Sequence, residues 1–390
     1  MIVKGESGRA MVTLTMLVFM AASTEFMPAG LLPAISRDLR VSEPMTGLLL
    51  TSFAFVVAAS AVPLACATIR WDRRTLLVAA AAGYSVGNLL IAQAGSFAVA
   101  AVGRAIGGFC HAILLSIVTV IAAHLVPPKR LGRSIAVLWI GTGMAYLAGI
   151  PVGAAYGTQS DGWRWVFLTL GIAAAVLALM ARWSVPSIPS TPTEESWTRG
   201  LRDVFAPGLL VVATATTMVL MGCFVLYSYI APLLILAGAS ESSIALFLLL
   251  YGTTAVGGLW WAAVLVDRRP RGGLIAALIL LAGGMLLFGA WEIGGVALWG
   301  FAYGSLATFF NTAALRAAPE SMNMAAALIN AGFNLGVGGG ALVGSAVLTV
   351  FAPGLLWPIA TGLVAGALCL IVGARRRAFP VLRAGAADRS

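Results

Sequence analysis

The chain of 390 residues is 60% apolar and 10% charged, whereas globular proteins average about 45–50% apolar and about 25% charged residues. So few charges cannot cover the surface of a soluble protein, which argues against a cytosolic enzyme, a nucleic-acid-binding protein or a disordered protein. The net charge of +10 does not favour nucleic acid either. The basic residues occur in small clusters between apolar runs, as the positive-inside rule predicts for an integral membrane protein.

The apolar runs predict twelve membrane-spanning helices, because a bilayer core of about 30 Å needs roughly 20 helical residues. The first run follows Lys4 and Arg9 and has the pattern of a signal peptide. Removing it would leave eleven spans and discard Glu25, so we keep it as a span. The predicted spans lie near 11–33, 44–69, 75–95, 97–125, 133–157, 163–183, 206–234, 241–265, 272–291, 294–316, 322–350 and 354–374.

The distribution of basic residues predicts the orientation of these spans. With the N-terminus inside, the connections place 20 of the 24 Lys and Arg residues on the inner side, and Arg104 lies within a span. The outer side holds only Arg37, Arg40 and Arg164. This asymmetry predicts that both termini are cytoplasmic. It also supports the count of twelve, because a wrong count would scramble the asymmetry.

A polar stretch rich in Ser, Pro and Thr separates the sixth span from the seventh. It divides the chain into an N-terminal six-helix bundle over 1–183, a cytoplasmic linker over 184–205, and a C-terminal six-helix bundle with a cytoplasmic tail over 206–390. Two features recur 195 residues apart, which is half of the chain. Asp72-Arg73-Arg74 recurs as Asp267-Arg268-Arg269, and Gly141, Ala145 and Gly149 recur as Gly336, Gly340 and Gly344. The shared offset predicts two pseudo-symmetric bundles with a substrate site between them near the midplane.

The sequence resembles the major facilitator superfamily over essentially its whole length, and within it the twelve-span drug:proton antiporters. Residues 68–74 are similar to the family's G-x-x-x-D-R-x-G-R-R loop, although Thr68 and Thr75 stand where glycine is usual. Residues 149–153 are similar to the antiporter motif G-P-x-x-G-G, with the proline shifted. The segments 24–28, 107–111 and 334–336 resemble the branch of sugar, arabinose, nucleoside and chloramphenicol exporters. The resemblance implies a transporter of the bacterial cytoplasmic membrane that works as an exporter.

Three residues are candidates for proton coupling. Glu25 is the only acidic residue away from the ends of a predicted span, since the others lie in tails, loops or span ends. An intramembrane carboxylate is a functional candidate by default; the alternative is a static partner for an arginine. Arg104 is the only Lys or Arg residue away from the ends of a predicted span. It lies at a similar depth to Glu25, so we expect the two to pair, unless Arg104 extends to the outer headgroups. His111, seven residues after Arg104, shares its helix face. His111 is a candidate to relay protons, to bind substrate, or to bond a neighbouring helix.

Polar and aromatic side chains within the spans are candidates for substrate binding. Phe26 belongs to the family-like segment beside Glu25, and His111 is shared with the proton-coupling set. The remaining candidates are Tyr227, Tyr229, Asn311, Asn330 and Asn334. Tyr and Asn offer directional hydrogen bonds without a buried charge. The alternative for the asparagines and tyrosines is hydrogen bonding between helices.

Loop charges and small residues are expected to serve conformational change. By resemblance, Asp72 and Arg73 form a cytoplasmic latch, with Asp267 and Arg268 as their counterparts; the alternative is a role in topology alone. The resemblance also implies that spans five and eleven meet the opposite half, and small residues four apart let helices approach closely. We therefore expect packing there by Gly149, Pro151, Gly153, Gly336, Gly340 and Gly344. The four cysteines lie in apolar segments without a CxxC, and we expect no metal or disulfide.

These features together predict a proton-coupled exporter of small neutral or amphipathic compounds such as drugs, which works by alternating access. Protons are the coupling ion, no cofactor is expected, and the partners are a small-molecule substrate and the lipid bilayer; we expect a monomer. The alternatives are a dedicated sugar or metabolite exporter and a proton symporter for uptake. A membrane enzyme is not favoured, because no HExxH, GxSxG or Cys/His cluster is present.

Overall fold

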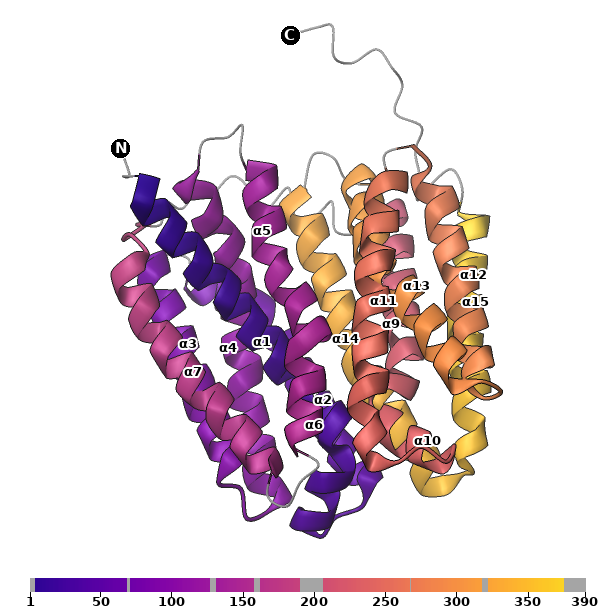
Figure 1. The fold of residues 1–390 in the computed structure, drawn as a ribbon. Helices are drawn as coiled ribbons and strands as arrows, with labels where there is room; N and C mark the ends of the chain where they lie inside the picture. The colour runs from indigo at the N-terminus through magenta and orange to yellow at the C-terminus, as the bar shows by residue number, and fades with distance from the viewer. Residues whose placement is uncertain are drawn as a thin grey trace, which may run out of the picture.

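The computed structural model describes residues 4–68, 71–126, 131–157, 162–189, 206–266, 268–317 and 322–374, and these residues contain helices and no strand. Most of the predicted linker, the loop residue Asp267 and the C-terminal tail lie outside the described residues. Figure 1 shows two groups of roughly parallel helices, with the start of the first helix and the end of the last helix at the same end of the bundle. We call the opposite end, where residues 40–42 connect the first two helices, the distal end.

Twelve helices of the described chain are long and apolar enough to cross a membrane, which confirms the predicted all-α fold and its number of spans. The helices of the first half are α1 (Lys4–Leu39), α2 (Glu43–Ala67), α3 (Arg73–Ala92), α4 (Phe97–Leu125), α5 (Leu131–Met144), the π-helix η2 (Ala145–Gly149), α6 (Ile150–Gly157) and α7 (Gly162–Ser184). Those of the second half are α9 (Pro207–Tyr227), α10 (Ile230–Leu236), η3 (Glu241–Ser243), α11 (Ile244–Leu265), α12 (Pro270–Phe288), α13 (Glu292–Ala317), α14 (Met322–Val350), η5 (Pro353–Leu355) and α15 (Leu356–Gly373).

Prolines explain why two predicted spans are interrupted. Proline has no N–H and its ring crowds the preceding turn. In the fifth span Pro151 follows the π-helix η2, where the N–H of Ile150 reaches back to the carbonyl of Ala145. In the seventh span Pro232 leaves the carbonyl of Ser228 without a helical donor, and the chain breaks between α9 and α10 at Ser228 and Tyr229. The fifth and seventh spans are therefore composite helices.

The apolar core differs between the two halves. In the second half it is one cluster that continues across the interface to residues of α1, among them Phe26. In the first half it separates into two clusters, one around Leu14 and Val18 of α1 and one around Leu31 and Ile35. The gap between these clusters falls at residues 22–26 of α1, where buried polar side chains gather. This polar layer contains Thr24, Glu25 and Arg104.

The two halves are joined at the distal end of the bundle. The hydroxyl of Ser345 on α14 donates to the carbonyl of Pro44 on α2 at 2.9 Å. Arg37 at the end of α1 makes a two-pronged ion pair with Glu241 of η3. Closer to the middle, α14 and α2 approach so tightly that a Cβ on Gly338 would lie 2.8 Å from the Phe55 ring. The distal end is therefore closed.

Candidate functional site

Arg104 occupies the centre of the polar layer, and Pro28 explains its position. Because Pro28 has no N–H, the carbonyl of Thr24 one turn earlier has no donor within α1. The Arg104 guanidinium supplies this donor: Nη1 bonds the Thr24 carbonyl at 2.6 Å and Nη2 bonds the Glu25 carbonyl at 2.8 Å. Its Nε bonds the carbonyl of Leu49 on α2 at 2.9 Å. Arg104, which is 1% exposed, thus ties α1 and α2 to α4.

The expected side-chain pair of Glu25 with Arg104 is replaced by another arrangement. The nitrogens of Arg104 bond main-chain carbonyls, whereas the Glu25 carboxylate faces His111, with Oε2 at 3.7 Å from Nε2. The Glu25 side chain is 12% exposed and that of His111 is 4% exposed. In the described chain, every other acidic residue lies in a loop or within three residues of a helix end. Glu25 is therefore an isolated carboxylate deep in the bundle.

His111 is held from two further helices. Its Nδ1 lies 2.7 Å from the hydroxyl of Tyr84 on α3, within hydrogen-bonding distance. The ring of Phe53 on α2 contacts both His111 and Arg104, with its centroid 5.3 Å from the imidazole and 4.2 Å from the guanidinium carbon. The polar layer thus orders Glu25, His111 and Tyr84 in a row, and the sequence reasoning did not identify Tyr84.

An aromatic cluster adjoins this layer and draws on both halves. Phe26 stacks on Tyr146 of η2 with 5.4 Å between ring centroids, and it lies 5.5 Å from Phe224 of α9. The hydroxyl groups of Tyr146 and Tyr303, one from each half, are 3.0 Å apart. We define the aromatic cluster as Phe26, Tyr146, Phe224, Tyr227, Tyr251, Trp299 and Tyr303. Of these, sequence reasoning had selected Phe26 and Tyr227.

The other substrate candidates lie elsewhere. Tyr229 is buried near the distal end, where its hydroxyl donates to the carbonyl of Ala341 at 2.9 Å, so it packs between helices as the structural alternative predicts. The exposed Asn311 donates to a carbonyl of its own helix. Asn334 is buried and donates to the carbonyl of Asn330 one turn earlier at 3.0 Å, while its own side-chain oxygen is buried without a partner in the described residues. Substrate binding by the asparagines stays a prediction.

The latch residue Asp72 contacts its own half of the protein. Asp72 caps α3 by accepting from the N–H of Thr75 at 3.0 Å, and its other oxygen accepts from Ser187 and from the N–H of Ile188, both at 2.7 Å. Burial raises the pKa of Asp72, but these hydrogen bonds outweigh it and hold the pKa below its ordinary value. The N–H of Arg73 also bonds Ile188. Asp72 and Arg73 therefore anchor the segment that follows α7, and their role as a cytoplasmic latch stays a prediction. Asp267 lies outside the described residues, and the N–H of Arg268 bonds the Leu265 carbonyl.

The predicted glycine faces pack within each half and not across the interface. Gly149 and Gly153 lie against Ser23 and Met27 of α1, with the buried Pro151 between them. Gly336, Gly340 and Gly344 of α14 lie against α9 and Tyr229 in the same way. The contacts across the interface come from other residues of the same spans: Gly338 of α14 meets α2, and the carbonyl of Tyr146 in η2 meets Gly252 of α11. The expectation was thus right for the spans and wrong for these glycines.

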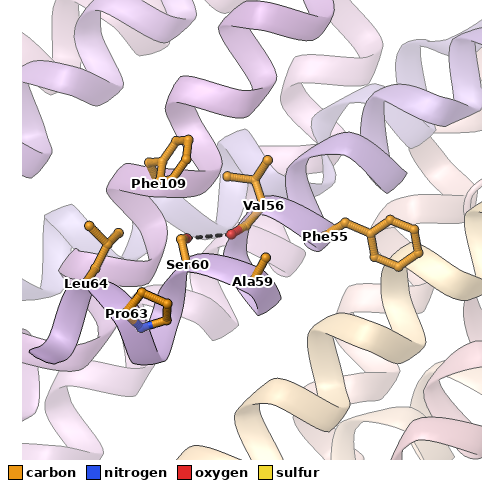
Figure 2. Close-up of a pocket in the computed structure, with 7 residues that line it drawn as sticks. All are labelled: Phe55, Val56, Ala59, Ser60, Pro63, Leu64 and Phe109. Carbon is orange, nitrogen blue, oxygen red and sulfur yellow. Dashed lines mark hydrogen bonds between the residues drawn. The ribbon is translucent and has the colours of Figure 1, made fainter.

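A separate hollow of about 420 Å³ lies between α2 and α4 (Figure 2). It is lined by Phe55, Val56, Ala59, Ser60, Pro63, Leu64 and Phe109. The Ser60 hydroxyl donates to the carbonyl of Val56, as Figure 2 shows, so the one polar side chain of the lining is already paired. The hollow has the apolar lining of a surface that faces lipid, and none of the predicted site residues contributes to it.

The chain is similar in sequence to a known transporter family and to proteins named as efflux transporters. A family model described as Major Facilitator Superfamily matches residues 14–341. A chloramphenicol efflux pump of Mycobacterium tuberculosis is 31% identical over 341 residues, which are 84% of this chain and 82% of the relative. A probable sugar efflux transporter of Mannheimia succiniciproducens is 28% identical over 339 residues, 85% of this chain and 84% of that protein.

Solved structures share the fold. A bacterial homologue of the human lysosomal transporter Spinster, in an inward-facing and occupied conformation, superposes with a TM-score of 0.77 at 18% identity and covers 96% of this chain and 98% of its own. A D-xylose-proton symporter superposes with a TM-score of 0.69 at 16% identity over 93% of this chain and 96% of its own. At these identities the likeness establishes the arrangement of helices and nothing finer.

Proposed function

Because the chain belongs to the Major Facilitator Superfamily, we propose that this multi-pass membrane transporter is a proton-coupled antiporter that exports small neutral or amphipathic compounds by alternating access. Its place would be the cytoplasmic membrane of a bacterium, with both termini in the cytoplasm, and it would act as a monomer. The proton is the coupling ion and no cofactor takes part. Among its relatives are proteins named as a chloramphenicol efflux pump and a sugar efflux transporter, which supports export.

The observation that carries the proposal is the adjacency of Glu25 and Phe26. Glu25 is the isolated carboxylate of the polar layer, and Phe26 is part of the aromatic cluster shared by both halves. A cargo molecule that separates the aromatic rings displaces Phe26, and through the shared backbone it displaces Glu25. A change in the surroundings of a buried carboxyl group shifts the balance between its protonated and ionised forms. Cargo binding and proton release are therefore linked through one turn of α1.

The transport cycle follows from this link and from the closed distal end. When the end of the bundle opposite the distal end is open to the cytoplasm, cargo enters the aromatic cluster and favours release of the proton from Glu25. The halves then separate at the distal end, where Arg37 meets Glu241 and Ser345 meets Pro44, and cargo leaves on the outer side. Glu25 takes up a proton there before the halves close again.

The lining favours aromatic or amphipathic cargo without a negative charge. The aromatic cluster offers ring faces and the hydroxyls of Tyr146 and Tyr303. Arg104 does not offer its charge to an anion, because its nitrogens are used by three main-chain carbonyls. A sugar stacks on aromatic rings but needs more hydrogen-bonding groups, so sugar export is the second candidate, favoured by the relative of that name.

The test uses purified protein in liposomes that contain a pH-sensitive dye. Chloramphenicol, a lipophilic cation, arabinose and a purine nucleoside are added in turn under an imposed pH gradient. The proposal expects that at least one compound drives protons across the membrane with wild type and not with Glu25→Gln. The matched control is Glu292→Gln, at the start of α13, which should behave like wild type. Proton movement that survives in Glu25→Gln, or cargo transport that never moves protons, would contradict the proposed coupling.

A further inference from the structure

The row of Tyr84, His111 and Glu25 carries an inference that rests on the proposed function and deepens it. We infer that Tyr84 is a positioning residue, which holds His111 as a neutral imidazole with its hydrogen on Nε2. In this form His111 donates toward the Glu25 carboxylate and does not itself carry the coupling proton. The inference decides between the roles that the sequence left open for His111.

The first step is the hydrogen-bond arrangement of Tyr84. Its side chain is fully buried, and in the described chain His111 is the hydrogen-bond partner of its hydroxyl, at 2.7 Å from Nδ1. If Nδ1 donated, the hydroxyl hydrogen of Tyr84 would be buried without an acceptor. If the hydroxyl donates, that hydrogen is satisfied and only oxygen lone pairs are left over, which is the milder loss. Tyr84 is therefore the donor and Nδ1 the acceptor.

The second step follows from the two nitrogens of a neutral imidazole. When Nδ1 accepts a hydrogen bond, the ring hydrogen is on Nε2. Nε2 is the atom that faces Glu25 Oε2, at 3.7 Å. The ring hydrogen of His111 is therefore directed toward the Glu25 carboxyl group.

The third step excludes His111 as a carrier of the proton. A doubly protonated His111 would need Nδ1 to donate, which would turn the Tyr84 hydroxyl hydrogen toward a position without an acceptor in the described residues. The imidazolium would also share the Phe53 ring with the Arg104 guanidinium, and two cations in one buried layer repel each other. The charged or titratable groups that face His111 are Glu25 from α1, Tyr84 from α3 and Arg104 from its own helix. Of these, Glu25 is the one suited to exchange the proton.

The test reads the state of His111 directly. The chain has two histidines, so isotope-labelled histidine gives two sets of nitrogen NMR signals, and a His124→Gln variant identifies those of His111. In wild type without cargo we expect the neutral form with the hydrogen on Nε2 throughout the range from about pH 5 to about pH 8. In Tyr84→Phe we expect a mixture of the two neutral forms, while the control Tyr156→Phe, at an exposed tyrosine, leaves the signals unchanged.

Three results would overturn the inference: a hydrogen on Nδ1 in wild type, a doubly protonated His111 in this range, or signals that Tyr84→Phe leaves unaltered. If Tyr84→Phe fails to fold, the wild-type spectrum still decides the first two. The NMR result needs no transport, so a failure of the proposed function in liposomes is distinguishable from a failure of this inference.

Discussion

We predict that Arg104 and Pro28 are coupled in their effect on stability, because Arg104 donates to the Thr24 carbonyl that Pro28 leaves without a helical donor. Removing Arg104 deprives the Thr24 carbonyl of its donor, and Pro28 has no N–H to replace it. An unpaired buried carbonyl costs about 1–3 kcal/mol. The carbonyls of Glu25 and Leu49 lose less, because each still has the N–H one turn further along its helix. We expect Arg104→Gln to lower the free energy of unfolding by about 3 kcal/mol.

The substitution Pro28→Ala supplies the missing N–H within α1, so it should rescue part of this loss. In a double-mutant cycle, Arg104→Gln should cost at least about 1 kcal/mol less in the Pro28→Ala background than in wild type. The matched control is Pro33→Ala, a second proline of α1 whose unpaired carbonyl is that of Ala29 and not one that Arg104 contacts. There the two effects should add within about 0.5 kcal/mol.

Equilibrium unfolding in detergent, followed by the fluorescence of the 11 tryptophans, measures all six proteins of the two cycles. If the effects of Pro28→Ala and Arg104→Gln simply add, Pro28 is not the reason that Arg104 bonds the Thr24 carbonyl. If the Pro33→Ala cycle shows the same coupling, the effect comes from a general stiffening of α1. Either result would refute the reasoning.

Three further predictions concern the interface between the halves and the hydrogen bonds of Asp72. Gly338→Ala should force the halves apart and open the distal end, which spin-label distances across that end would report. The control Gly362→Ala, which has open space for a Cβ, should leave these distances unchanged. Equal distances in the two variants would contradict this prediction. Glu241→Gln should raise the distal-open population by about fivefold at most, because it removes one exposed ion pair to Arg37, worth about 0.2–1 kcal/mol; a larger shift in the same distances would contradict an exposed pair. Asp72→Asn should lower the unfolding midpoint at neutral pH, because the Asp72 pKa lies below its ordinary value. That stabilisation is present above the ordinary pKa of about 3.9 and is lost as the pH falls through the lower folded value, so the two midpoints should converge in acid; a constant difference would contradict it.

Much of the fold could be predicted because the spans and loops of a membrane protein differ strongly in composition. Spans are long apolar runs and the loops between them carry the charge, so the twelve helices were predictable. The polar layer was partly predictable for the same reason. Glu25, Arg104 and His111 are conspicuous among apolar residues, and the structure brings them into one region.

The contacts of these residues were less predictable, because depth does not identify the partner. Glu25 and Arg104 match in depth, yet Arg104 bonds the main chain that Pro28 leaves unpaired. The signal was present, since a proline in mid-span exposes the carbonyl four residues earlier. Glycines four apart likewise indicate a close approach without naming the neighbour, which for Gly340 is α9 of its own half.

The aromatic cluster could not be predicted as a unit. Aromatic residues are common throughout the spans, and only the arrangement of five separate elements brings these seven rings together. Trp299 and Tyr303 lie one turn apart on α13 and face the same way, which was a weak signal. No sequence pattern indicated the role of Tyr84, because a single tyrosine in an apolar helix does not reveal that it contacts a histidine.

If cargo and proton are coupled as proposed, the division of the first half's core explains why α1 is the element that links them. Phe26 belongs to the core that continues into the second half, whereas residues on either side of the polar layer belong to two separate clusters of the first half. The middle of α1 is thus packed against the opposite half and held in its own half by Arg104. A rearrangement of the halves must then change the surroundings of Glu25, since it lies between the Arg104 bonds and the Phe26 ring. The proposed coupling therefore needs no charge on the cargo, and one carboxylate would suffice for neutral compounds and cations alike.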